Sequence, residues 1–93
     1  MKIVYEEKFI NSFTAIWDYI SLDSKTRANT FKSKIKKLIE DIPSMPYKCR
    51  KSIYFKDESI RDLIFKGYTV VYKIDELKDI IIIIGIKKYQ NNI

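Results

Sequence analysis

The chain has no histidine, a single cysteine, Cys49, and only two glycines, Gly67 and Gly85. Without histidine and with one thiol, it cannot form a thiolate or imidazole zinc site or a Ser-His-Asp triad. Two isolated glycines exclude the glycine-rich loops that hold phosphate in P-loop and dinucleotide-binding proteins. One cysteine forms no intramolecular disulfide, which fits a reducing compartment, and we interpret Cys49 as an inert small side chain. We therefore expect no metal and no cofactor.

Long hydrophobic segments are also lacking. The most apolar run covers residues 80–86 and is flanked by Asp79 and Lys87, whereas a membrane-spanning helix needs about 20 apolar residues. Two glutamates, Glu6 and Glu7, lie where a signal peptide has its apolar stretch. We expect a cytoplasmic protein that does not enter a membrane. Its 93 residues, of which 46% are hydrophobic, are enough for one domain over residues 1–93.

Positive charge is concentrated in the middle of the chain. Residues 25–51 contain nine basic and two acidic residues, a net charge of +7, although the whole chain carries only +6. Such a segment attracts polyanions or acidic protein partners. A solvated helix face in a protein from an AT-rich genome would fit the fifteen lysines and eighteen isoleucines equally well. The candidate residues for binding a nucleic acid or another target are Lys32, Lys36, Lys37, Lys48, Arg50 and Lys51 of this segment, and Lys66 of a later turn.

The first half of the chain predicts a strand followed by two helices. Residues 1–5 are apolar-rich and typical of an opening strand. Asp23 or Ser24 is expected to cap the second helix, and Pro43 to end it. A four-residue connection favours an antiparallel pair of helices. The apolar residues that recur at helical spacing are Phe9, Phe13, Ile16, Trp17 and Ile20 in the first helix, and Ala28, Phe31, Ile35, Leu38, Ile39 and Ile42 in the second.

The second half of the chain predicts strands. Residues 60–65 and 68–74 are rich in β-branched and aromatic side chains, and Lys66-Gly67 between them is a tight hairpin signal. Residues 80–84 are all isoleucine, which suggests a strand covered on both faces, and residues 52–55 are a candidate additional strand. We expect an α+β fold in which an N-terminal strand and an antiparallel two-helix hairpin precede a mainly antiparallel sheet of three to four strands. The hairpin would cover one face of this sheet and leave the other open for binding.

Arginine, lysine and tyrosine near strand ends are the remaining candidates for catalysis. Metal-free RNA cleavage needs a base for the 2′-hydroxyl, stabilisation of negative charge on phosphorus and an acid for the leaving oxygen. Tyr89 with Lys87 and Lys88, together with Arg61 on an adjacent strand, would be such a set. Lys87 and Lys88 could equally serve only to solubilise the end of a very apolar strand. Whether the protein is an enzyme stays open at this point.

A family resemblance extends over nearly the whole chain. It rests on Asp18-Tyr19-Ile20 at the end of the first predicted helix, Ala28, Phe31 and Ile35 along the second, Pro43 and Pro46 before a basic turn, Ile60-Arg61-Asp62-Leu63, Gly67-Tyr68-Thr69-Val70-Val71-Tyr72-Lys73-Ile74, and the isoleucine strand. In this order and spacing, the chain resembles the RelE/ParE toxins of bacterial type II toxin–antitoxin systems.

The resemblance implies a toxin that arrests growth and is neutralised by a co-expressed antitoxin with an acidic C-terminal segment. RelE-like members cleave messenger RNA on the ribosome, whereas ParE-like members act on DNA gyrase. By position, Arg61, Lys87 or Lys88, and Tyr89 match residues that act in the ribonucleases. Leu63 and Thr69 stand where those ribonucleases have a lysine and an arginine. Together with the long paired helices, these two residues favour the gyrase-directed function over the ribonuclease.

A third interpretation is a non-toxic module that binds nucleic acid or protein. Aromatic rings beside lysines can stack nucleobases, and the candidate rings are those of Tyr5, Tyr47, Tyr54, Phe55, Tyr68 and Tyr72. Packing in a half-buried sheet explains the same residues. We expect no small-molecule substrate in any of the three interpretations.

Overall fold

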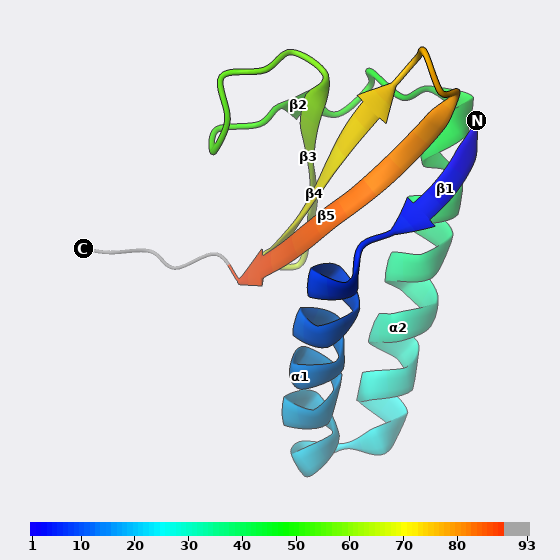
Figure 1. The fold of residues 1–93 in the computed structure, drawn as a ribbon. Helices are drawn as coiled ribbons and strands as arrows, with labels where there is room; N and C mark the ends of the chain where they lie inside the picture. Colours follow the sequence, from blue (N-terminus) through cyan, green and yellow to red (C-terminus); the bar gives the residue numbers. More distant parts are fainter. Residues whose placement is uncertain (89–93) are drawn as a thin grey trace.

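The computed structural model describes residues 1–88, which form a five-stranded sheet with two helices on one of its faces (Figure 1). The strand order is β1-β5-β4-β3-β2; β1 runs parallel to β5, and the other neighbouring pairs are antiparallel. The predicted α+β fold is therefore confirmed. In chain order the elements are β1 (Lys2–Tyr5), α1 (Glu7–Asp23), α2 (Lys25–Glu40), a short 3-10 helix (Ile42–Ser44), β2 (Arg50–Lys51), β3 (Ile60–Phe65), β4 (Tyr68–Asp75) and β5 (Ile80–Lys88).

One residue, Ser24, connects the two helices. Its backbone is extended, its N–H donates to the carbonyl of Ile20 (3.0 Å), and its Oγ accepts from the N–H of Arg27 (3.1 Å). Ser24 thus ends α1 and caps α2 at the same time. The predicted four-residue connection is wrong, because α1 stays helical as far as Asp23.

The core lies between the two helices and the helix-facing side of the sheet. Phe31 of α2 is buried at its centre, with its ring centroid 5.9 Å from that of Phe13 in α1 and 5.0 Å from that of Tyr68 in β4. Aromatic contacts therefore join α1 to α2 and α2 to the sheet. In α1 only Phe9 is fully buried, and the rest of its predicted stripe is partly exposed. The other buried core residues are Ile35, Ile39 and Ile42 on the helical side and Leu63, Val70, Tyr72, Ile74, Ile81, Ile83 and Ile86 in the sheet.

The isoleucine strand β5 has one fully covered face. Its pairing with β4 skips Ile84, which forms a β-bulge next to Gly85. The expectation that this strand is covered on both faces is wrong, because both helices pack on the same side of the sheet (Figure 1). The buried side chains are those of Ile81, Ile83 and Ile86, and the partly exposed ones those of Ile80, Ile82 and Ile84.

Residues 52–55, predicted as a candidate strand, lie in a loop. β2 ends before them, although the N–H of Ser52 still donates to the carbonyl of Ile60 (2.9 Å). The N–H of Ile53 then donates to the carboxylate of Asp62 (3.1 Å) instead of to a backbone carbonyl. A side-chain acceptor thus ends the ladder, so the predicted strand is wrong.

This loop, residues 52–59, covers part of the sheet face opposite the helices. Leu63 faces the core, so its neighbour Asp62 points to the opposite face, where its side chain is fully buried beneath the loop. Lys87 points to the same face, with its Nζ 4.4 Å from the ring centroid of Tyr54 in the loop. The sheet face that was expected to be open is therefore covered in part.

A buried hydroxyl ties the sheet to the turn that precedes β2. Tyr72 is completely buried, and its hydroxyl donates to the carbonyl of Pro46 (2.6 Å). Burial, and then a hydrogen bond with Cys49, raises the pKa of Tyr72. The hydroxyl therefore keeps its proton and remains a donor.

Replacing Tyr72 with phenylalanine should lower the free energy of unfolding by about 1–3 kcal/mol, because the partly buried Pro46 carbonyl loses its donor. Urea unfolding followed by circular dichroism measures the change. Tyr19→Phe removes an exposed hydroxyl and is the matched control, which should unfold like the wild type. Equal midpoints for the two variants would contradict the role of the Tyr72 hydroxyl.

Candidate functional site

The lysines of α2 form the uncompensated part of the basic middle segment. Lys32, Lys36 and Lys37 are exposed, because the buried stripe of α2 lies on the side that faces the sheet. Among the residues that the structure describes, none of the three takes part in an ion pair. This surface of α2 therefore keeps its positive charge.

Three basic residues of the middle segment follow α2, and these, Lys48, Arg50 and Lys51, lie at or just before the β2 edge of the sheet. Arg50 is 3.4 Å from the buried carboxylate of Asp62, and Lys51 is 2.7 Å from Glu58. The hydrogen bond from Lys51 lowers the pKa of the Glu58 carboxyl, so this pair stays charged. The candidate binding residues of the middle segment thus form two groups. The lysines on α2 have no ion pair among the described residues, whereas Arg50 and Lys51 at the sheet edge are ion-paired.

Arg61, predicted as a catalytic residue, lies on β3 with its guanidinium bound to three backbone carbonyls. Its Nε donates to Glu58 (2.9 Å), and its Nη1 donates to Cys49 (3.1 Å) and Tyr47 (3.4 Å). The guanidinium also lies 4.9 Å from the ring centroid of Tyr47. Arg61 therefore fastens the turn before β2 to the end of the 52–59 loop.

Lys87 and Lys88, also predicted as catalytic, end β5 and point to opposite faces of the sheet. Lys87 lies over Tyr54 of the 52–59 loop, whereas the Nζ of Lys88 lies 5.8 Å from the ring centroid of Tyr19 in α1. The predicted adjacency of Arg61 is wrong, because β4 separates its strand from β5. The described residues thus do not bring Arg61, Lys87 and Lys88 into one cluster. Tyr89 lies outside the described residues.

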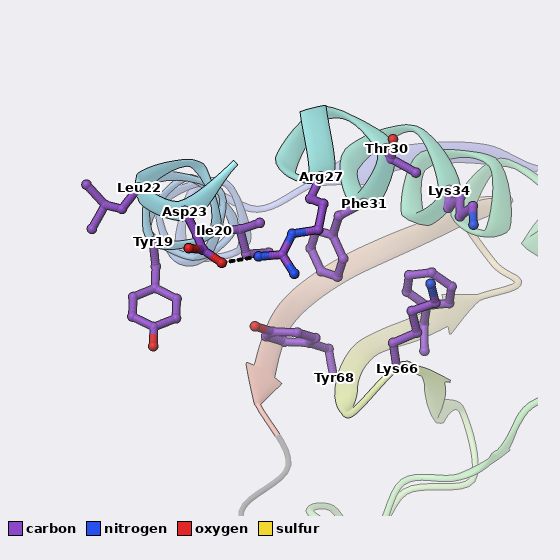
Figure 2. A pocket seen from close by; sticks show the side chains of 11 residues that line it. Tyr19, Ile20, Leu22, Asp23, Arg27, Thr30, Phe31, Lys34, Lys66 and Tyr68 are labelled. Carbon is purple, nitrogen blue, oxygen red and sulfur yellow. Dashed lines mark hydrogen bonds and ion pairs between the residues drawn. The ribbon is translucent and has the colours of Figure 1, made fainter. Parts of the chain in front are cut away.

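A pocket lies at the tip of the helical hairpin (Figure 2), with a volume of about 640 Å³. We call it the hairpin-tip pocket. The pocket opens between the α1–α2 connection and the β3–β4 turn. The sequence did not predict it, because its lining residues come from α1, α2, β3, β4 and the turn between these two strands. Its lining residues are Tyr19, Ile20, Leu22, Asp23, Arg27, Thr30, Phe31, Lys34, Phe65, Lys66 and Tyr68. Of these, Lys66 was a predicted binding residue, and Tyr68 was a candidate ring for stacking nucleobases.

An apolar groove of about 610 Å³ runs between α1 and α2. We call it the interhelical groove. Ile10 is 49% exposed in it, and the indole N–H of Trp17 is buried there without an acceptor among the described residues. Lys32 and Lys36 contribute positive charge from α2. The feature of the sequence that could have predicted this groove was Ile10, an apolar residue that lies outside the predicted stripe of the first helix.

Neither helix is long and apolar enough to cross a membrane, as judged over residues 1–88. Within the same residues, no group of three or more cysteine or acidic side chains is placed to hold a metal ion.

Several solved structures share this arrangement of elements. A structure described as the chromosomal ParDE TA system from P. aeruginosa is 15% identical over 97% of each chain, with a TM-score of 0.76. A mutant E. coli RelE toxin in complex with a RelBc antitoxin peptide is 16% identical over 97% of this chain and 84% of that chain, with a TM-score of 0.68. The intact E. coli RelBE toxin–antitoxin complex is 17% identical over 97% of this chain and 98% of that chain, with a TM-score of 0.64. Among curated proteins, none matches this chain.

The helical hairpin on a mainly antiparallel sheet is thus a fold that this chain shares with the ParDE and RelE structures. A family model described as "ParE toxin of type II toxin-antitoxin system, parDE" matches residues 3–92. The chain belongs to this ParE toxin family. The resemblance found in the sequence is confirmed.

Replacing Arg61 with lysine should lower the free energy of unfolding by about 1–3 kcal/mol, because a single ammonium cannot reach all three carbonyls. Urea unfolding measures the loss. The matched control is Arg27→Lys, which changes an arginine in an exposed ion pair with Asp23 and should cost well under about 1 kcal/mol. Equal stability of the two variants would show that Arg61 does not hold the turn.

Proposed function

We propose that this chain arrests bacterial growth by acting on DNA gyrase, and that a cognate antitoxin neutralises it. The observation that carries the proposal is the ParE toxin family match over residues 3–92. The sequence resemblance attributes a gyrase target to ParE-like members of the wider family. A toxin of this kind needs a surface that binds its target rather than a set of catalytic side chains.

The surroundings of the ribonuclease-like positions support a binding function. The donors of Arg61 are directed at backbone carbonyls. Leu63 and Thr69 are buried, at 9% and 2% exposure, and neither offers a positive charge to a phosphate. The exposed, unpaired lysines of α2 remain available to attract a large anionic target.

The alternative is a ribosome-dependent ribonuclease. It is favoured by the exposure of Lys87 and Lys88 at the end of β5, directly before Tyr89, and by the likeness in fold to RelE structures. Here Lys87, Lys88 and Tyr89 would supply charge stabilisation and proton transfer. Arg61 would join them only if it left its carbonyl partners.

The interhelical groove suits an antitoxin segment that is both apolar and acidic. Ile10 and Trp17 provide apolar surface. Lys32 and Lys36 on the α2 side would attract carboxylates, which would speed association and select the partner. The similar solved structures include toxin–antitoxin complexes.

Purified protein added to DNA gyrase and plasmid should cause cleaved gyrase–DNA complexes to accumulate, and pre-mixing with the antitoxin should prevent this. Agarose gels after detergent and protease treatment measure the cleaved DNA. Normal supercoiling at excess toxin would contradict the gyrase proposal. Codon-phased cuts in translated messages, lost in Tyr89→Phe, would establish the ribonuclease in its place.

Replacing Ile10 with aspartate should weaken antitoxin binding at least about tenfold, a loss of about 1.4 kcal/mol, because it places a charge in the apolar groove. Isothermal titration calorimetry measures the affinity. The matched control is Leu77→Asp, which alters a fully exposed leucine in the β4–β5 turn and should bind like the wild type. Unchanged affinity of Ile10→Asp would place the antitoxin elsewhere.

A further inference from the structure

The floor of the hairpin-tip pocket is made of aromatic rings held in fixed positions. The buried ring of Phe31 lies edge-on to Tyr68, with centroids 5.0 Å apart, and 5.9 Å from the centroid of Phe65. Figure 2 shows Tyr68 below Phe31 and Arg27, with Tyr19 on one side and Lys66 on the other. Rings fixed in this way lose little freedom when a flat ligand stacks on them.

Tyr19 stands at the rim of the same pocket with its ring largely uncovered. It is 67% exposed, and no other aromatic ring of residues 1–88 packs on it. The Nζ of Lys88 lies 5.8 Å from its centroid. An exposed ring beside a cation is the arrangement on which a nucleobase stacks while its phosphate is neutralised.

Positive charge surrounds these rings. Arg27, Lys34 and Lys66 line the pocket, and the only carboxylate among its lining residues is that of Asp23. Asp23 forms an ion pair with Arg27, but both side chains are more than half exposed, so the pair is weak and Arg27 keeps further N–H donors free. The pocket therefore has an excess of donors for phosphate oxygens.

Lys66 has a backbone conformation that is unfavourable for lysine. It lies in the two-residue turn between β3 and β4 with a φ of 47°, before Gly67 with a φ of 80°. Asparagine followed by glycine is the preferred pair for such a turn, because asparagine adopts positive φ more readily than lysine. The turn would be more stable with asparagine, whereas lysine brings a cation to the mouth of the pocket.

From these features we propose that the hairpin-tip pocket binds unpaired nucleotides of a nucleic-acid strand, with a base stacked on Tyr19 or Tyr68 and its phosphates held by Arg27, Lys34, Lys66 and Lys88. A volume of about 640 Å³ is within the usual range for a small-ligand site. An acidic peptide would use the same cations but has no need of uncovered ring faces. The proposal goes beyond the toxin assignment, because it concerns a direct contact between this chain and nucleic acid.

Fluorescence anisotropy with a labelled oligodeoxythymidine strand of about ten nucleotides tests the proposal, since single-strand sites span about 4–16 nucleotides. Tyr19→Ala should weaken binding about 5- to 100-fold, whereas Tyr19→Phe, which keeps the ring, should bind like the wild type. Lys66→Asn should also weaken binding and reduce the slope of log affinity against log salt by about 0.7, as expected for one lost phosphate contact on a single strand. The matched control, Lys78→Asn in the β4–β5 turn, should bind like the wild type.

Lys66→Asn also separates binding from folding, because its midpoint of urea unfolding should rise while its affinity for the strand falls. Wild-type affinity in both Tyr19→Ala and Lys66→Asn would overturn the proposal. So would an oligoglutamate peptide that binds more tightly than the strand and depends on Lys66, since the pocket would then take an acidic protein segment. The assay contains neither gyrase nor antitoxin, so its outcome is independent of the proposed target.

Discussion

The one-residue connection at Ser24 holds α1 and α2 side by side. The hairpin-tip pocket and the interhelical groove both depend on this arrangement. With no loop between them, the last turn of α1 and the first turn of α2 are fixed close together. α2 supplies most of the fully buried helical side chains, while α1 packs against β5 and also directs Ile10 and Trp17 into the interhelical groove. The tip of the hairpin extends past the end of the sheet in Figure 1, where it forms one wall of the hairpin-tip pocket.

The turn before β2 is held by side chains rather than by regular backbone pairing. Tyr72 of β4 and Arg61 of β3 donate to the carbonyls of Pro46, Tyr47 and Cys49. Both side chains come from the helix-facing side of neighbouring strands, since Arg61 pairs directly with Tyr72 in the register. Arg61 thus lies at a strand position that suggests phosphate binding, but its N–H groups bind backbone carbonyls. The chemical type of a residue and its place in a family pattern do not by themselves define its task.

The elements that the sequence predicted well are those with a strong local pattern. The stripe of α2 and the hairpin at Lys66-Gly67 depend on spacing along the chain, and both appear in the structure. The errors arose where distant groups decide the outcome. The Asp62 carboxylate ends the ladder at Ile53, and within residues 1–88 both helices pack on the same face of the sheet, which leaves alternate isoleucines of β5 partly exposed. Pockets were not predictable, because their walls come from elements that only the folded chain brings together.

The parallel pairing of β1 with β5 joins the first strand to the last one along the chain. β5 lies between β1 and β4, so neither of these strands has its full set of hydrogen bonds until the C-terminal third has been synthesised. During translation the helical hairpin leaves the ribosome without a complete sheet to cover its apolar stripe. Folding of the sheet therefore waits for the synthesis of β5, and a chain truncated before β5 would expose the core face of the helices to solvent and to chaperones.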